Sequence, residues 1–224
     1  MNAPHQETAE IGVLALQGDF EEHAVILTTL GAHATEVRLP AQLEGLDGLV
    51  IPGGESTTIS RLMHRWELLV PVRERAMDGM AVWGTCAGAI LLAQSSPDLD
   101  REGLRLMDID VERNAFGRQV DSFEVELTAP VLGPRPFPAV FIRAPIITRV
   151  GPKAETLARL ADGTVVAVRQ ERLLATAFHP ELTDDARFHR YFMDLAMNHA
   201  SDSSVAQAAP GAGRLSRNGP SIPA

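Results

Sequence analysis

Strand-like and helix-like segments alternate over about the first ninety residues, and this alternation restricts the fold more than any other feature. The strand-like segments lie at residues 11–16, 34–39, 48–51 and 80–83. Helix-like segments begin near residues 19, 56, 67 and 86. Asp19 and Glu22 resemble a helix-capping pair at the start of the first, which has apolar residues at helical spacing up to Leu30. Because strands separated by helices form βαβ units, we expect a mostly parallel sheet flanked by helices.

The pattern changes after residue 104. Short β-rich runs follow up to residue 170, and they predict added antiparallel or mixed strands: LRLMDIDVE, SFEVELT, AVFIRA and TVVAVRQ. A last strand is expected at residues 173–178 and a last helix at residues 184–199. The predicted fold class is therefore α/β, with a three-layer, open, mostly parallel sheet and added antiparallel strands.

One domain accounts for most of the chain. Residues 1–10 are polar and are expected to form a flexible N-terminus, whereas residues 11–199 are expected to form one compact domain. Sixteen of the 24 residues from 201 to 224 are Ala, Ser, Gly or Pro. Such a composition offers no core-forming pattern, so we expect residues 200–224 to be a disordered tail.

Charge and composition exclude several classes of protein. The chain has 20 basic and 29 acidic residues, a formal charge of −9, which argues against binding to nucleic acid or to an anionic membrane. No apolar run has the length of a membrane span, and the first residues do not form a secretory signal. A single cysteine excludes an internal disulfide and a multi-cysteine metal site. A cytoplasmic protein without a metal is expected.

The segment around Cys86 carries the strongest chemical signal. Cys86 stands in the sequence Gly84-Thr85-Cys86-Ala87-Gly88, between a predicted strand and a predicted helix. This is the arrangement of a nucleophile elbow with cysteine in place of serine, where glycines permit close backbone approach. The helix N-terminus favours the thiolate, and the N–H of Ala87 can stabilise an oxyanion. The alternative is a small cysteine buried in a tight turn.

A thiolate nucleophile requires a base, and His179 is the best candidate among seven histidines. It ends an apolar strand, where open α/β sheets bind ligands, and Glu181 could orient its ring. Equally, Glu181 could simply favour the start of the next helix. Four other histidines fall within or at the end of predicted helices, where we expect solvated surface positions: His23, His64, His189 and His199.

Two further features are weak when taken alone. The loop at residues 52–56 ends a parallel strand, and its Gly53-Gly54 pair could aim backbone N–H groups at an anion. Arg113 and Arg143 lie near strand ends, where a guanidinium could bind a carboxylate. An ordinary glycine-rich loop and two surface arginines would explain the same residues.

Together these motifs resemble class I (triad) glutamine amidotransferases, which have a flavodoxin-like sheet, and more closely the glutaminase subunits of pyridoxal 5′-phosphate synthases. The resemblance extends from about residue 11 to residue 198. It is carried by the segments GVLALQGDFEEH, LVIPGGESTTI, GTCAGAILLA, VERNAFGRQVDSFE, FIRAP and FHPEL, in that order. The second and fourth segments are much more specific than the elbow alone.

The resemblance implies hydrolysis of L-glutamine to glutamate and ammonia, which passes to a (β/α)₈-barrel synthase subunit. It implies that Cys86 is the nucleophile, that His179 and Glu181 complete the triad, and that Gly54 and Ala87 form the oxyanion hole. The residues implied to contact glutamine are Gly54, Glu55, Ser56, Arg113, Ile142 (through its backbone) and Arg143. Pyridoxal 5′-phosphate is the product of such a complex, and no cofactor is implied for this subunit.

Two other functions remain open at this level. The chain could be another Cys–His–Glu hydrolase, such as a γ-glutamyl hydrolase or a peptidase-like enzyme. It could also be a non-catalytic scaffold with an amidotransferase fold. The loop at residues 52–56 and the two arginines argue against the first, and the intact set of Cys86, His179 and Glu181 argues against the second.

Overall fold

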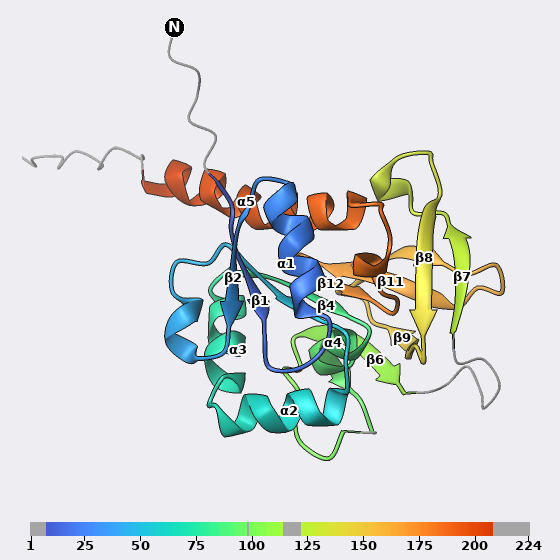
Figure 1. The fold of residues 1–224 in the computed structure, drawn as a ribbon, viewed down its shortest axis with the longest axis horizontal. Coiled ribbons are helices and arrows are strands. Elements are labelled where there is room, and N and C mark those ends of the chain that lie inside the picture. The colour runs from blue at the N-terminus through green and yellow to red at the C-terminus, as the bar shows by residue number, and fades with distance from the viewer. Residues whose placement is uncertain (1–7, 98, 114–121, 208–224) are drawn as a thin grey trace, which may run out of the picture.

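The computed structural model describes residues 8–97, 99–113 and 122–207. Figure 1 shows a central sheet with helices on both sides. The strands are β1 (Glu10–Leu14), β2 (His33–Val37), β3 (Gly48–Ile51), β4 (Ala81–Thr85), β5 (Ala93–Ser95), β6 (Met107–Glu112), β7 (Ser122–Leu127), β8 (Phe137–Ile142), β9 (Ile146–Val150), β10 (Glu155–Arg159), β11 (Val165–Gln170) and β12 (Leu173–Thr176). The helices are α1 (Phe20–Thr29), α2 (Ser56–Arg65), α3 (Leu69–Met77), α4 (Ala87–Leu92) and α5 (Arg187–Gln207).

The first half of the sheet is parallel, as the sequence predicts. Its strands lie in the order β2-β1-β3-β4-β12, and each neighbouring pair is parallel. The last of these strands comes from the far end of the chain and aligns Leu173 with Val82 and Thr176 with Thr85. The carboxyl ends of these strands therefore meet at one edge, where such sheets bind ligands.

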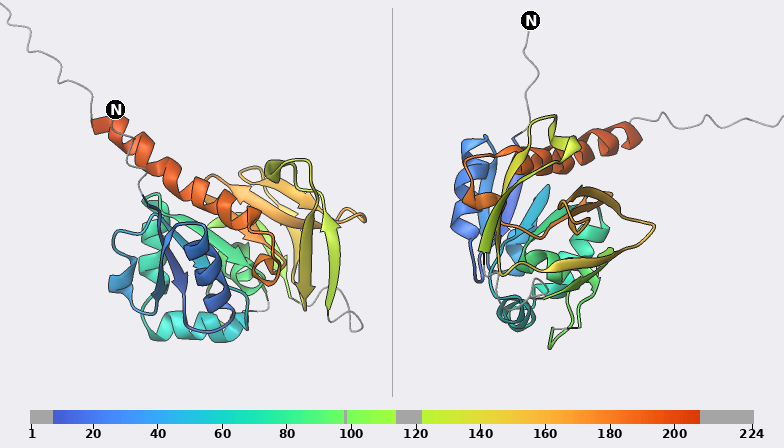
Figure 2. Two further views of the ribbon diagram at one scale, coloured as in Figure 1. Left: turned by 45° about the horizontal axis from the view of Figure 1, so that its top comes forward. Right: turned by 90° about the vertical axis from the view of Figure 1, so that its right-hand side faces the viewer.

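The second half of the sheet is mixed. Strands β11, β9 and β6 extend the sheet through antiparallel pairs, and β5 adds a parallel edge to β6. Strand β10 pairs with β11, and β7 and β8 form a separate antiparallel pair. In Figure 1 and in the left view of Figure 2, this pair stands at the end of the molecule opposite β2. The predicted fold class is confirmed, with a curled sheet and extra antiparallel strands.

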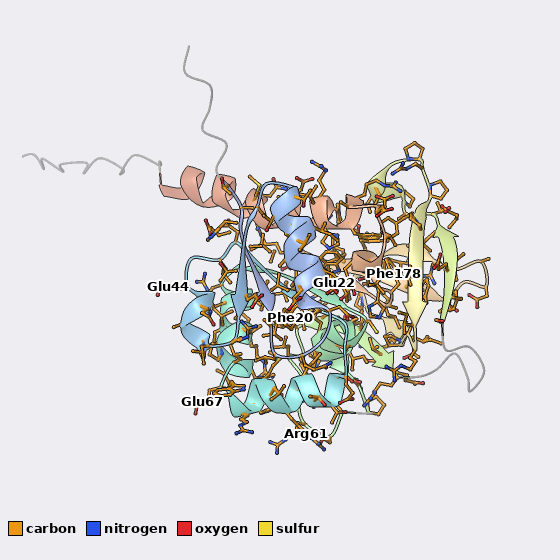
Figure 3. All side chains as sticks on the ribbon, viewed as in Figure 1. Phe20, Glu22, Glu44, Arg61, Glu67 and Phe178 are labelled. Carbon is orange, nitrogen blue, oxygen red and sulfur yellow. The ribbon has the colours of Figure 1, made fainter. Side chains whose placement is uncertain are left out.

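Alternate residues of the central strands point into two separate cores. In β3, Leu49 and Ile51 join the core beneath α2, α3 and α4, whereas Val50 joins the core beneath α1 and α5. A strand buried on both faces has this pattern, which explains its uninterrupted apolar sequence. Figure 2 shows α5 running across the face that also carries α1. In Figure 3, Phe178 lies within the molecule, while Glu44, Arg61 and Glu67 project from its surface.

The helix at the C-terminal end differs from the expectation. Helix α5 continues to Gln207, so the end predicted at residue 199 is eight residues too early, and residues 200–207 of the expected tail belong to the helix. The extension contains no Gly or Pro, and Ala and Gln are good helix formers, so nothing in residues 200–207 stops the helix. The remainder of the expected tail, residues 208–224, and residues 1–7 of the expected flexible N-terminus lie outside the described residues.

Three shorter strands and one capping contact also depart from the sequence analysis. The sequence predicts no strand at β5, β9 or β10. Exposed and buried residues do not alternate along β9 and β10, so these two segments lack the sequence pattern of a half-buried strand. Asp19 was expected to cap α1 with Glu22, but its side chain makes no capping hydrogen bond. It lies instead beside His179. Among the described residues, no helix has the length and apolar character needed to cross a membrane.

Candidate active site

A cavity of about 470 Å³ opens at the carboxyl ends of β1, β3, β4 and β12. Loops from β6 and β8 complete its wall. The residues that line it are Gln17, Gly18, Asp19, Gly54, Glu55, Ser56, Cys86, Ala87, Ile90, Arg113, Ile142, Arg143, Pro145, His179 and Leu182. The cavity therefore brings together nine of the ten predicted site residues. The tenth, Glu181, is buried directly behind it.

Cys86 occupies the sharp turn between β4 and α4. Its φ of 45° and ψ of −101° are strained for a residue with a side chain, and such strain is typical of functional turns. A Cβ atom on Gly84 would overlap the backbone of Gly88, and one on Gly88 would overlap the carbonyl oxygen of Ile51. Both glycines are thus required by close backbone packing. The turn leaves Cys86 only 7% exposed, at the base of the cavity.

Two backbone contacts fix the position of the Cys86 sulfur. The N–H of Cys86 donates to the carbonyl of Thr176 at 2.8 Å, which ties the elbow to β12. The sulfur lies 3.9 Å from the carbonyl oxygen of Ile142. Ala87 is the first residue of α4, so its N–H has no partner within the helix. This N–H is available at the same end of the cavity.

The Gly53-Gly54 loop is held by the segment that follows β1. The carbonyl of Gly53 accepts from the N–H of Asp19 at 3.2 Å, and the side-chain oxygen of Gln17 accepts from the N–H of Glu55 at 2.7 Å. Gly54 has a φ of +153°, a conformation that favours glycine. Turning the peptide between Gly53 and Gly54 therefore requires the bond to Asp19 to break.

His179 lies between the cysteine and two carboxylates. Its Nδ1 is 2.7 Å from Oε1 of Glu181 and 3.5 Å from Oδ2 of Asp19, which leaves Nε2 for Cys86. Burial by itself lowers the pKa of His179, but interactions with Asp19, Cys86 and Glu181 outweigh burial and raise it well above its usual value. The ring consequently holds a proton in this environment.

Glu181 is fully buried and still ionised. Burial alone raises the pKa of Glu181, but electrostatic interaction with His23 and the hydrogen bond to His179 hold it well below its usual range. Nε2 of His23 lies 3.2 Å from Oε2 of Glu181. The contact is not aligned as a hydrogen bond, because Oε2 has no hydrogen-bond partner among the described residues. The carboxylate is thus set between two imidazole rings.

The surface positions expected for His23 and His189 are wrong. Both side chains are completely buried, and Nδ1 of His23 lies 2.9 Å from Nε2 of His189. The signal was present in the sequence, because His23 precedes Leu27 by four residues and His189 precedes Phe192 by three. Each histidine therefore shares the inward face of its helix with an apolar residue of the core.

The residues expected to bind glutamine fall into two groups. Glu55, rather than Ser56, caps α2, because its carboxylate accepts from the N–H groups of Thr57 at 3.1 Å and Thr58 at 2.7 Å. It also pairs with Arg113 at 2.8 Å. Burial raises the pKa of Glu55, but the hydrogen bonds from Thr58 and Thr57 prevail and lower it to about 2. The Glu55 and Arg113 side chains thus support each other at the cavity wall.

The second group consists of Ser56 and Arg143, which line the cavity. Ser56 is 2% exposed, and its hydroxyl has no hydrogen-bond partner among the described residues. Arg143 is exposed at the rim and has a φ of 42°, a strained conformation typical of functional loops. A buried hydroxyl without a partner is costly unless a ligand or water satisfies it.

Three side chains of this site are of the kinds that bind metal ions. Asp19, His179 and Glu181 each present a possible ligand atom, and these atoms lie within 4.8 Å of one another. However, His179 uses Nδ1 toward both carboxylates, and the short bond to Glu181 requires a proton there. A metal on this nitrogen would replace that proton, so the arrangement suits proton transfer better than metal coordination.

Comparison with known proteins agrees with this geometry. The model of the SNO glutamine amidotransferase family matches residues 13–198. A Herpetosiphon aurantiacus protein named pyridoxal 5′-phosphate synthase subunit PdxT is 60% identical over 188 residues, 83% of this chain and 99% of its own length. A Dehalococcoides mccartyi protein of the same name is 57% identical over 192 residues, 85% of this chain and 98% of its own length.

Solved structures give the same result. The chain matches a structure described as a glutamine amidotransferase with a TM-score of 0.78 and 52% identity, over 83% of this chain and 98% of the other. A putative GMP synthase subunit from Thermoplasma acidophilum shares the fold alone, with a TM-score of 0.66 and 20% identity, over 89% of this chain and 100% of the other. The match over residues 13–198 and these close relatives establish that the chain belongs to the SNO glutamine amidotransferase family.

Proposed function

We propose that this glutamine amidotransferase hydrolyses L-glutamine to L-glutamate and ammonia with a Cys86–His179–Glu181 triad. We further propose that it delivers the ammonia to the (β/α)₈-barrel synthase subunit of a pyridoxal 5′-phosphate synthase. The observation that carries the proposal is one cavity in which a strained cysteine elbow faces a histidine bonded at 2.7 Å to a buried carboxylate. The relatives named as synthase subunits support the choice of partner.

In the first half-reaction, the Cys86 thiolate attacks the side-chain carbonyl carbon of glutamine. The proton of the thiol has moved to His179, whose raised pKa favours the imidazolium. The carbonyl oxygen becomes an oxyanion, held by the N–H of Ala87 and an N–H of the Gly53-Gly54 turn. Each such donor typically lowers the activation barrier by about 3–4 kcal/mol. His179 then gives its proton to the departing nitrogen, which leaves as ammonia.

In the second half-reaction, water replaces the ammonia. His179 takes a proton from that water, which attacks the γ-glutamyl thioester and forms a second oxyanion in the same place. The C–S bond breaks, glutamate leaves, and Cys86 returns as the thiolate beside protonated His179. Glu181 holds the ring orientation through both steps.

The substrate's α-amino and α-carboxylate groups require partners beyond the triad. We assign them to Gly54, Glu55, Ser56, Arg113, Arg143 and the backbone of Ile142. The free hydroxyl of Ser56 supports its place in this set. Because Glu55 and Arg113 already pair, glutamine would have to bind to this pair as a unit or displace one bond of it. No cofactor takes part in the proposed reaction, and we propose a cytoplasmic location.

We also propose that the partner gates the reaction at the Gly53-Gly54 peptide. In one orientation its N–H completes the oxyanion hole, and in the other its carbonyl opposes the developing charge. Losing one oxyanion donor costs about 10²–10³ in rate, so one flip suffices as a switch. The bond between Asp19 and Gly53 favours the orientation seen in the free chain. A synthase that binds the competent orientation more tightly shifts the population toward it.

Ammonia release from glutamine by the purified chain, with and without an equimolar barrel synthase, tests the function. We expect slow release alone and a large increase in kcat with the synthase. A γ-glutamyl peptide, offered under the same conditions, should be a poor substrate. Preference for the peptide would support a γ-glutamyl hydrolase instead, and no turnover of either substrate with the synthase present would support a scaffold. Equal kcat with and without the synthase would exclude the gate.

A further inference from the structure

A chain of buried polar groups continues behind the proposed triad. Glu181 contacts His179 on one side and His23 on the other, and His23 in turn contacts His189. Helix α1 supplies His23, and α5 supplies His189, so this chain crosses from the cavity into the core beneath those two helices. The reaction proposed above uses neither of these histidines.

The protons of this chain can be assigned from its contacts. Burial lowers the pKa of His189 well below its usual value, so His189 is neutral. Nδ1 of His189 has no hydrogen-bond partner among the described residues. A buried acceptor without a partner is better tolerated than a buried N–H donor, so we place the proton of His189 on Nε2.

The assignment of His189 determines the tautomer of His23. Nε2–H of His189 donates to Nδ1 of His23 across 2.9 Å, so His23 accepts there and carries its own proton on Nε2. That nitrogen lies 3.2 Å from Oε2 of Glu181 and 3.4 Å from the hydroxyl of Thr85. The positive end of the ring therefore faces the carboxylate.

We propose that His23, with its tautomer fixed by His189, is a positioning residue that keeps Glu181 ionised and aimed at His179. The proposal rests on the triad of the proposed function. Without His23, the fully buried carboxylate would keep its hydrogen bond to His179 but lose the N–H that faces Oε2 at 3.2 Å. Burial then favours the protonated acid. A protonated Glu181 accepts less strongly from Nδ1–H of His179, so the imidazolium loses its main support.

The other groups that face these residues do not replace His23. Asp19, at the start of α1, faces His179 at 3.5 Å, but it is partly exposed and, as a carboxylate, it has no N–H to offer Glu181. Thr85 from β4 offers one hydroxyl, and Trp83 packs its ring edge-on to both histidines and donates its N–H to Thr176. Only His23 brings an N–H donor to Oε2 of Glu181 among the described residues.

Alkylation of Cys86 by iodoacetamide measures this effect without glutamine or a partner. The chain has one cysteine, so the rate reports on Cys86 alone. We expect the acidic limb of the pH profile to move upward by about one pH unit in His23→Leu, which is about tenfold in rate on that limb. His23→Gln keeps an N–H that can face Glu181, and its profile should remain close to that of the wild type. His33→Leu, which changes an exposed histidine, should have no effect.

Several outcomes would overturn the proposal. An unchanged acidic limb in folded His23→Leu would do so, as would equal shifts in His23→Gln and His23→Leu, because packing would then explain the result. Should His23→Leu fail to fold, His189→Leu provides the test, since His23 can then place its proton on Nδ1. We expect a smaller shift in the same direction, and no shift would overturn the proposal. Wild-type turnover of glutamine, measured in parallel with the synthase, reports separately on the proposed function.

Discussion

Replacing Glu181 with glutamine removes one charge from the proposed triad while retaining its shape. Oε1 of Glu181 lies 2.7 Å from Nδ1 of His179, and the two charge centres are roughly 4 Å apart. At an effective dielectric constant of about 20, unit charges at that separation interact by about 4 kcal/mol. The amide oxygen still accepts the hydrogen bond, so we expect a net loss of about 3 kcal/mol, or roughly 10²-fold in kcat.

The variant should also be less stable. Its amide NH₂ group would face Nε2–H of His23, which places two donors opposite each other in a site without exposed surface. An unsatisfied buried polar group typically costs about 1–3 kcal/mol. The matched control is Glu10→Gln, because Glu10 and His33 form a similar carboxylate–imidazole pair on the surface, 2.5 Å apart. That change should leave both kcat and Tm close to those of the wild type.

Steady-state kinetics of ammonia release, with the synthase present, provides the assay. His179→Asn serves as the comparison, since it removes the proton carrier and should lose at least about 10⁴-fold in kcat. A greater loss in Glu181→Gln than in His179→Asn would show that the two roles are misassigned. Full activity in Glu181→Gln would refute the argument that the buried charge supports the imidazolium.

Two further predictions concern stability. Gly88→Ala should destabilise the chain by about 3 kcal/mol, or roughly 6–12 °C in Tm, because the new Cβ would overlap the carbonyl of Ile51. The control is Gly31→Ala, which strains φ but has open space around it and should cost about 1–2 kcal/mol. Equal Tm losses in the two variants would contradict the packing argument. The pKa of Glu181 is lowered in the folded state, so its carboxylate stabilises the fold at neutral pH, and this stabilisation is lost as the pH falls below about 4.5. In thermal unfolding, the Tm of the wild type should therefore fall more steeply with acid than the Tm of Glu181→Gln. Parallel curves of Tm against pH would exclude this linkage.

The parallel half of the fold could be predicted from sequence because burial on both faces leaves a plain signal. Strand β3 is buried along its whole length and spans residues 48–51, the range that its apolar sequence predicts. Strands β9 and β10 could not be predicted in the same way, since their exposed and buried residues do not alternate. Their position depends on antiparallel pairing with β6 and β11, which is a tertiary property.

The candidate site shows the same division. Cys86 and its glycines could be predicted because the elbow itself requires them, and the carboxyl end of β12 fixes His179. The capping of α2 by Glu55 and its ion pair with Arg113 could not be predicted, because the ion pair joins two segments that are distant in sequence. The burial of His23 was predictable from helical spacing, but histidine is intermediate in burial, so its residue type did not add to that signal.

Glutamine hydrolysis by Cys86→Ala tests the central claim most directly. The variant should fold normally, because alanine fits the space that the cysteine occupies, and an unchanged Tm would establish this. With the synthase present and glutamine saturating, we predict that ammonia release falls at least about 10⁴-fold, to the background rate. Turnover within about tenfold of the wild type would contradict the assignment of Cys86 as the nucleophile, and with it the mechanism proposed for this site.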